Sequence, residues 1–219
     1  MRLNWLGRAT MNNGLRAMGQ HYAASWLERL GGRVEGGRVL EVGCGRGVGV
    51  KIILERFGAA EVEALDLDPK MIESARRRLA AFGLARVRLS VGDVNSLKAG
   101  DATFDAVFDF GAIHLEPKWR KAVAEVRRVL KPGGKFFFEW VTNGVLRLPY
   151  PLVTEGFGRM EPPSPALLMQ ELERQGILVG QNFVCPRLAA LTGFVGDLVG
   201  VGRVAPPFEG SPSMEERPA

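Results

Sequence analysis

The residues best suited to chemistry in this sequence follow a short apolar run. Residues 39–42 (Val-Leu-Glu-Val) lead directly into residues 43–47 (Gly-Cys-Gly-Arg-Gly), where glycine occupies every second position. Glycine lets the backbone adopt positive φ and approach a ligand closely, and a helix that follows points its first amide groups at that ligand. This stretch therefore predicts a ligand-binding turn between a strand and a helix.

The spacing of these glycines departs from the two common nucleotide-binding patterns. A dinucleotide site has the pattern Gly-x-Gly-x-x-Gly, and here Val48 or Val50 takes the place of the third glycine, depending on the register. A mononucleotide P-loop needs Gly-Lys-Ser/Thr at its end, which is absent here. The turn is thus expected to bind neither NAD nor ATP.

The elements that position this turn alternate between strands and helices. Turn residues and apolar periodicity separate them, as at Pro69 and at residues 131–134 (Lys-Pro-Gly-Gly), which predict a helix stop and a tight turn. The expected strands are 38–42, 61–67, 87–91, 104–110 and 135–141, and the expected helices are 48–57, 69–82, 117–130 and 166–175. This alternation predicts an α/β fold, with a mainly parallel, doubly wound sheet covered by helices on both faces.

Further segments surround this core. Apolar residues recur with helical spacing at Leu15, Met18, Tyr22, Trp26 and Leu30, which predicts an amphipathic N-terminal helix. We expect a helical cap over 1–35, the main domain over 36–204 with a lid-like insertion over 143–165, and a disordered tail over 205–219. Residues 183–204 are apolar and glycine-rich and fit either two further strands or a strand and a short helix.

Composition narrows the class of protein. The chain has 219 residues, 46% of them hydrophobic, and no uninterrupted apolar stretch long enough to span a membrane. Cys44 and Cys185 are too few for a disulfide framework and lack zinc-site spacing, so a cytoplasmic location without metal is expected. The net charge of +5 leaves room for contact with a membrane surface, but the basic residues are scattered, and the run 76–78 reads as a solvated helix face.

The sequence resembles the class I S-adenosylmethionine-dependent methyltransferases, through motifs that occur in the family's order. After the glycine turn come Asp66 within Ala-Leu-Asp-Leu-Asp-Pro, the Gly-Asp pair at 92–93, Phe-Asp-Ala-Val at 104–107 and Arg-Val-Leu-Lys-Pro-Gly-Gly at 128–134. Within the family, the pattern is most similar to small-molecule methyltransferases, including those of quinone biosynthesis. The resemblance covers residues 38–141 and implies a Rossmann-like fold with S-adenosylmethionine as cofactor.

The resemblance also implies a role for each motif residue in cofactor binding. Glu41 would lie near the ammonium group, the turn formed by Gly43, Cys44 and Gly45 would face the methionine part, and Asp66 would accept the ribose hydroxyls. Asp93 would accept the adenine amino group, Leu67 and Val94 would flank the ring, and Phe110 and Gly111 would lie near the sulfonium. These residue types suit the task, because a diol and an exocyclic amine both require acceptor oxygens.

Transfer of a methyl group from a sulfonium is an in-line displacement that depends mainly on holding the acceptor in place. His114 follows the fourth strand and is the leading candidate for a general base, with a packing role as the alternative; Glu139 is a second candidate. We expect a small aromatic or lipid-like acceptor bound by Tyr22, His114, Trp140, Tyr150 and Phe157, with Met160 also contributing.

Two other functions are compatible with the same fold. The basic composition is compatible with a nucleic-acid or protein methyltransferase, but residues 109–112 (Asp-Phe-Gly-Ala) stand where base-amino methyltransferases carry Asn/Asp-Pro-Pro-aromatic. No nucleic-acid partner is therefore expected. A cofactor-binding protein without catalysis is the third alternative, since a fold and a ligand site do not prove turnover. The sequence does not indicate the acceptor atom or an oligomeric state.

Overall fold

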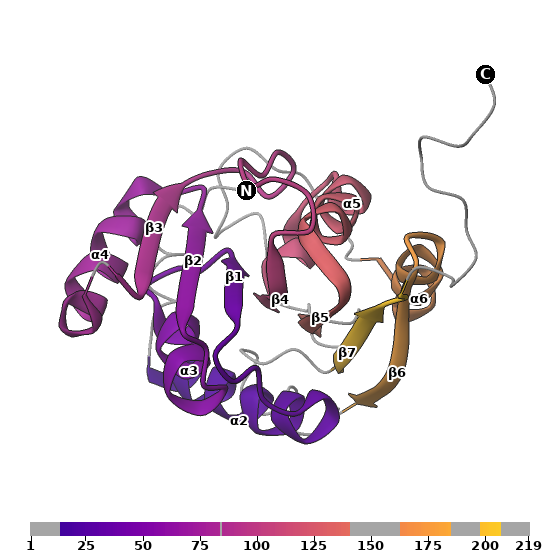
Figure 1. Cartoon of the computed structure of the whole chain (residues 1–219), viewed down its shortest axis with the longest axis horizontal. Helices are drawn as coiled ribbons and strands as arrows, with labels where there is room; N and C mark the ends of the chain where they lie inside the picture. The colour runs from indigo at the N-terminus through magenta and orange to yellow at the C-terminus, as the bar shows by residue number, and fades with distance from the viewer. Residues whose placement is uncertain (1–13, 84, 141–162, 185–197, 207–219) are drawn as a thin grey trace.

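The computed structural model describes residues 14–83, 85–140, 163–184 and 198–206. Within these residues the chain forms a seven-stranded sheet in the order β3-β2-β1-β4-β5-β7-β6 (Figure 1). The strands β3, β2, β1, β4 and β5 run parallel to one another, whereas β7 runs antiparallel to both β5 and β6. The strands are β1 (Arg38–Val42), β2 (Glu61–Asp66), β3 (Val87–Val91), β4 (Phe104–Phe110), β5 (Leu130–Trp140), β6 (Ile177–Val184) and β7 (Leu198–Val204). The predicted α/β fold with a mainly parallel sheet is confirmed.

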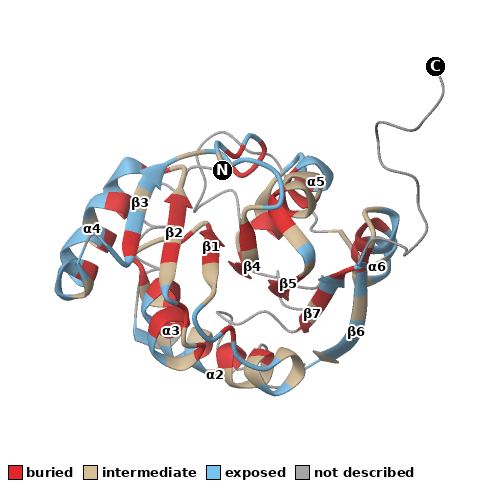
Figure 2. Cartoon of the chain, in the orientation of Figure 1, coloured by how far each residue is buried: buried red, intermediate tan, exposed pale blue. Residues whose placement is uncertain are grey.

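Helices cover both faces of this sheet. One apolar cluster joins α2, α3 and α4 to one face, and a second joins α5 and α6 to the other. The helices are α2 (Gly14–Gly31), α3 (Val48–Arg56), α4 (Pro69–Leu79), α5 (Trp119–Val129) and α6 (Pro165–Arg174), with short 3-10 turns η1 (Ala80–Phe82) and η2 (Ile113–Leu115). The arrangement explains why the central strands are mostly apolar: both of their faces are buried (Figure 2).

The N-terminal helix forms as predicted, but a different face of it turns inward. Ala23, Ala24 and Leu27 are buried, whereas Met18 is 69% exposed. Trp26 is only partly buried and packs at the border of the same cluster. The helix is therefore rotated about its axis relative to the expected orientation. Its small residues allow it to lie close to the sheet, and its larger side chains lie at the edge of the contact.

The fifth strand begins earlier than predicted. Leu130 already pairs with Phe104, and the next pair joins Lys135 to Ala106, so residues 131–134 form an irregularity inside β5. The predicted turn is thus an outward bulge of the strand, with Gly133 at φ 75°.

The C-terminal region forms two strands. The first begins at Ile177, ahead of the segment 183–204 in which strands were expected. β6 pairs with β7 and lies at the edge of the sheet, and its central residues are exposed and polar, including Gln181 and Asn182. An exposed edge strand lacks the apolar run that identifies a buried strand. The predicted lid up to residue 162 and the tail from residue 207 lie outside the described residues. The proposed division into cap, main domain and tail stays a prediction.

Candidate cofactor site

A cavity lies at the carboxyl ends of the parallel strands β1, β2, β3 and β4, where ligands bind in open α/β sheets. The turn after each strand contributes to its lining, and α2 adds Arg16, Ala17 and Gln20. The predicted cofactor residues found in this lining are Gly43, Cys44, Gly45, Asp66, Leu67, Asp93, Val94, Phe110 and Gly111. The structure thus brings together residues from four separate strand ends, while Glu41 is not part of the lining.

The glycine turn is held in a conformation that favours glycine. Gly43, Gly45 and Gly47 have φ values of 67°, 51° and 78°. At Gly43 a β carbon would also lie 2.2 Å from the β carbon of Ala112, in the turn after β4. Both the backbone conformation and the close approach of the two turns therefore require glycine at position 43.

Asp66 joins two of these turns through its carboxylate. Its Oδ2 accepts a hydrogen bond from the Gly45 amide at 2.9 Å, and its Oδ1 accepts one from the Asp68 amide at 2.8 Å. Burial raises the pKa of Asp66. Each carboxylate oxygen can accept a second hydrogen bond, so Asp66 retains acceptor capacity for a ligand in the cavity.

Asp68, two residues further along the chain, has a structural role. It precedes α4 as the N-cap residue, and its side chain accepts a hydrogen bond from the Lys70 amide at 2.9 Å. This assigns the helix cap to Asp68 and distinguishes it from Asp66, whose carboxylate bonds to the glycine turn.

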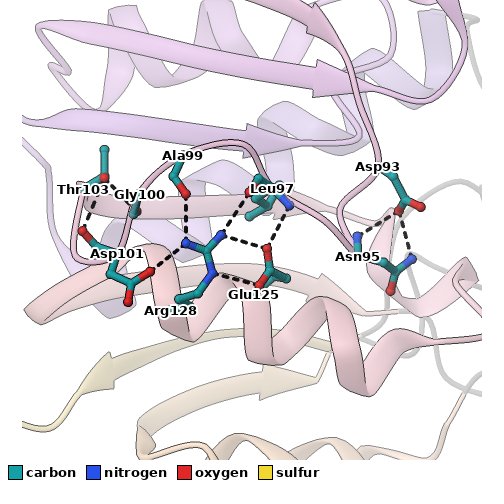
Figure 3. A network of polar contacts seen from close by, with 9 residues as sticks. All are labelled: Asp93, Asn95, Leu97, Ala99, Gly100, Asp101, Thr103, Glu125 and Arg128. Atoms are coloured by element: carbon teal, nitrogen blue, oxygen red, sulfur yellow. Dashed lines mark hydrogen bonds and ion pairs between the residues drawn. The ribbon is translucent and has the colours of Figure 1, made fainter.

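Asp93 lies in the connection between β3 and β4, which has no helix (Figure 3). Further along this connection, Arg128 of α5 donates to the carbonyl oxygens of Leu97 and Ala99 at 3.0 and 2.8 Å. Arg128 also forms ion pairs with Asp101 and Glu125, each at 2.8 Å. The arginine of the Arg-Val-Leu-Lys-Pro-Gly-Gly motif therefore anchors the loop that begins at Asp93, a role that the motif alone did not reveal.

Glu41 lies behind the cavity. Its side chain is fully buried, and neither carboxylate oxygen makes a hydrogen bond of good geometry with a described residue. Burial raises the pKa of Glu41 well above its usual range, and the nearby carboxylates of Asp66 and Asp109 raise it further. Its expected contact with the cofactor ammonium stays a prediction.

The end of β4 is fixed by a buried carboxylate that sequence reasoning did not identify. Asp109 accepts hydrogen bonds from the amides of Ala112 and Ile113, at 2.6 and 3.3 Å. Burial raises the pKa of Asp109 to about 7. This side chain shapes the turn that places Phe110 and Gly111 at the cavity.

His114 is buried beside Trp140, with a ring-centroid distance of 5.8 Å, and does not line the cavity. Both of its ring nitrogens are buried without a hydrogen-bond partner among the described residues. Burial, together with the nearby Arg16, lowers the pKa of His114 to about 3. The imidazole is therefore neutral at physiological pH, and this environment disfavours it as a general base.

A buried ion pair lies beside the cavity. The sequence analysis named only one of its members, Glu139, as a candidate functional residue. Arg16 of α2 contacts Glu139 of β5 at 3.1 Å, with side-chain exposures of 7% and 1%. Arg16 also donates to the carbonyl oxygen of Phe110. Glu139, the second base candidate, is thus held by a guanidinium. An arginine in an amphipathic helix gives no signal of such a partner.

The expected acceptor residues are not gathered in the described part of the site. Trp140 is fully buried, and its indole nitrogen donates to the carbonyl oxygen of Pro163 at 3.0 Å, so the structure places it in the core. Tyr22 is partly buried on α2 and does not line the cavity. Tyr150, Phe157 and Met160 lie outside the described residues.

The described residues contain no group of three or more histidine, cysteine or acidic side chains arranged to hold a metal ion. None of their helices has the length and apolar character needed to cross a membrane. The expected cytoplasmic location stays a prediction.

The strand order and the position of the cavity define a Rossmann-like protein with a ligand site at its strand ends. Residues 39–134 match the family model described as a methyltransferase domain. The fold is therefore the Rossmann-like one of class I methyltransferases, and residues 39–134 match a methyltransferase domain, as the motifs predicted.

Known proteins support this assignment. The chain is 43% identical over 105 residues to a fatty-acid O-methyltransferase of Mycolicibacterium smegmatis, a match that covers 48% of this chain and 37% of the relative. It also resembles a chain from the Haloferax volcanii complex between the Trm112 methyltransferase activator and a methyltransferase. That likeness has a TM-score of 0.73 and 21% identity, and it covers 94% of this chain and 96% of the other.

A third similar protein was solved with ligands bound. It is the 1,6-didemethyltoxoflavin-N1-methyltransferase of Burkholderia thailandensis, in complex with 1,6-didemethyltoxoflavin and S-adenosylhomocysteine. The likeness has a TM-score of 0.63 and 25% identity, and it covers 85% of this chain and 78% of the other. The first curated relatives, in contrast, are matched over only 37% and 40% of their length.

Proposed function

We propose that this chain binds S-adenosylmethionine in the cavity at the strand ends and transfers its methyl group to a small, lipid-like acceptor. One observation carries the proposal. Acceptor side chains and permissive glycines from four strand ends line a single cavity, in the order that the family motifs require. A sheet edge that only packed against other elements would not need this combination.

The residues present fit the cofactor. The positive φ of Gly43 and Gly45 opens a cradle for the methionine part, and Asp66 offers acceptor oxygens to the ribose. Asp93 would accept the adenine amino group, with Leu67 and Val94 on either side of the ring. When bound, S-adenosylmethionine supplies a methyl group already activated by its sulfonium.

The protein's own contribution is then to hold the acceptor in line and exclude water. Phe110 and Gly111 would border the methyl group, in a turn that Asp109 fixes through backbone hydrogen bonds. Because the environment of His114 disfavours proton transfer, the described residues suit an acceptor that is already nucleophilic at neutral pH.

The resemblance to a fatty-acid O-methyltransferase supports a lipid-like acceptor. A carboxylate is ionised at neutral pH and attacks the methyl carbon without a base, which agrees with a neutral, buried His114. We therefore propose fatty-acid carboxylates as the first acceptors to test. Tyr150 and Phe157, which the sequence analysis predicts to bind the acceptor, lie outside the described residues.

Two measurements on the purified full chain test the proposal. Calorimetry at micromolar protein is expected to show saturable binding of S-adenosylhomocysteine and no binding of NAD. With S-adenosylmethionine labelled in its methyl group, fatty acids of several chain lengths are expected to yield labelled esters. Saturable NAD binding without heat from S-adenosylhomocysteine would overturn the family assignment, whereas cofactor binding without ester formation would exclude only this acceptor class.

A further inference from the structure

Asn95 lies next to Asp93 (Figure 3), and of these two residues only Asp93 lines the cavity. It is 6% exposed and belongs to the connection between β3 and β4. Its backbone amide and its side-chain Nδ2 both donate to Oδ1 of Asp93, at 2.8 and 2.9 Å. The same Nδ2 donates to Oε2 of Glu116 at 2.7 Å.

These contacts connect two carboxylates that come from different loops. Asp93 and Glu116 both line the cavity, whereas Asn95 does not. An ionised carboxylate only accepts hydrogen bonds, so the amide of Asn95 must turn its NH₂ group toward both of them. The orientation of the Asn95 side chain is therefore determined by its two neighbours.

This orientation leaves the other end of the amide without a donor. The Oδ1 atom of Asn95 is buried and has no hydrogen-bond partner among the described residues. An unsatisfied buried acceptor is unfavourable for folding, and such atoms are uncommon in native proteins. The stability of the loop alone does not account for Asn95, which points to a role in arranging the carboxylates.

We propose that Asn95 is a positioning residue that makes the cavity select a purine with an amino group over one with a carbonyl group. The two donors from Asn95 occupy Oδ1 of Asp93, and among the described residues Oδ2 has no donor of its own. Oδ2 is thus available to accept from the 6-amino group of adenine. The inference rests on the proposed function, because it assigns the adenine to this end of the cavity.

The charges at this end strengthen the same selectivity. Asp93 and Glu116 both line this end of the cavity, and a carbonyl oxygen placed against the Asp93 carboxylate would meet another acceptor. A site that accepts a hydrogen bond from the 6-amino group loses that bond with an analogue that cannot donate from the same position, which lowers its affinity for the analogue.

The experiment compares two ligands whose purines differ at the 6-position. The ligands are S-adenosylhomocysteine and S-inosylhomocysteine, in which a carbonyl oxygen replaces the 6-amino group and N1 carries a hydrogen. Calorimetry is done on the parent, on Asn95→Asp, and on Asn182→Asp as the matched control. Asn182 is exposed on β6 at the far edge of the sheet, so the control makes the same chemical change away from the cavity.

We expect the parent and Asn182→Asp to prefer the adenosyl ligand by about tenfold or more. Asn95→Asp removes the amide that holds Asp93 and places a like charge beside it, so the Asp93 carboxylate is expected to turn away from the 6-position and the preference to fall to about threefold or less. Asn95→Ala removes the side-chain donor without adding charge, and an intermediate preference is expected. Thermal unfolding of each variant establishes that it is folded before ligands are compared.

An equal loss of affinity for both ligands in Asn95→Asp and Asn95→Ala would show a purely structural role and overturn the inference. An unchanged preference in both variants would do the same. If the parent bound neither ligand, the proposed function itself would fail, and the inference with it.

Discussion

Two neighbouring carboxylates, Asp66 and Asp68, have separate tasks that can be tested one residue at a time. Asp66 accepts from the glycine turn and lines the cavity, whereas Asp68 caps α4. Asp66→Ala is expected to weaken S-adenosylhomocysteine binding by about 2–4 kcal/mol, roughly 30-fold to 1,000-fold, because the ribose loses charge-assisted hydrogen bonds. Calorimetry measures this loss.

The control for that prediction is Asp68→Ala. Removing a helix cap is expected to cost about 1 kcal/mol of unfolding free energy and little ligand affinity. If Asp66→Ala bound within threefold of the parent while Asp68→Ala lost the site, the ribose assignment would move to Asp68.

Gly43 supports a second prediction about a single residue, with Gly36 as its matched control. Both have positive φ, at 67° and 69°, but only at Gly43 would a β carbon meet another residue, whereas nothing lies within 4 Å at Gly36. Gly36→Ala is expected to cost about 1–2 kcal/mol of stability from backbone strain alone. Gly43→Ala should cost more and also weaken S-adenosylhomocysteine binding, because the two cavity turns must move apart. Denaturant unfolding measures the loss of stability and calorimetry measures the loss of affinity. If Gly43→Ala and Gly36→Ala had equal effects on both, this explanation would be contradicted.

At the scale of secondary-structure elements, the position of α2 beside the cavity depends on the buried ion pair between Arg16 and Glu139. Breaking a buried ion pair leaves an uncompensated charge, so Arg16→Met or Glu139→Leu alone is expected to destabilise the fold by about 3–5 kcal/mol. The double variant removes both charges and is expected to recover much of this loss. Denaturant unfolding of the four proteins completes the cycle.

Simple additivity in that cycle would mean that the two side chains act independently, and α2 would then be held by its apolar face alone. That face consists of small residues such as Ala23 and Ala24, together with Leu27.

The stability of the whole molecule depends on pH through two buried groups, His114 and Asp109, whose pKa values shift in opposite directions. The pKa of His114 falls from its ordinary 6.5 to about 3, so the stability it contributes is present above pH 6.5 and is lost as pH falls toward 3. The pKa of Asp109 rises from 3.8 to about 7, so its contribution is present below pH 3.8 and is lost as pH rises toward 7. The two effects oppose each other over the shared range.

A single substitution separates them. His114→Leu keeps a similar side-chain volume and removes the titrating group, while Asp109 stays the same in both proteins. Relative to the parent, the variant is expected to gain about 2 kcal/mol of unfolding free energy when pH is lowered from 7 to 5. Denaturant unfolding at the two pH values checks this. If the difference in unfolding free energy between the variant and the parent were the same at both pH values, His114 would not contribute to the pH dependence in this range.

The sequence by itself determined the central architecture and most of the residues that line the cavity. The glycine turn, the carboxylates at 66 and 93, and the alternation of strands and helices are local patterns, and each is set by backbone sterics or by burial on both sides of a strand. Parallel strands bring their carboxyl ends to one edge, so local motifs at those ends meet in space.

Only the tertiary structure decided which residues support that site. Arg16 and Glu139 are 123 residues apart, and Asn95 joins loops that share no sequence pattern. The inward face of α2 and the first residues of β6 were likewise not predicted, because neither is set by its own periodicity. Such contacts depend on how distant elements pack, and a polar side chain does not reveal in the sequence which distant partner it will meet.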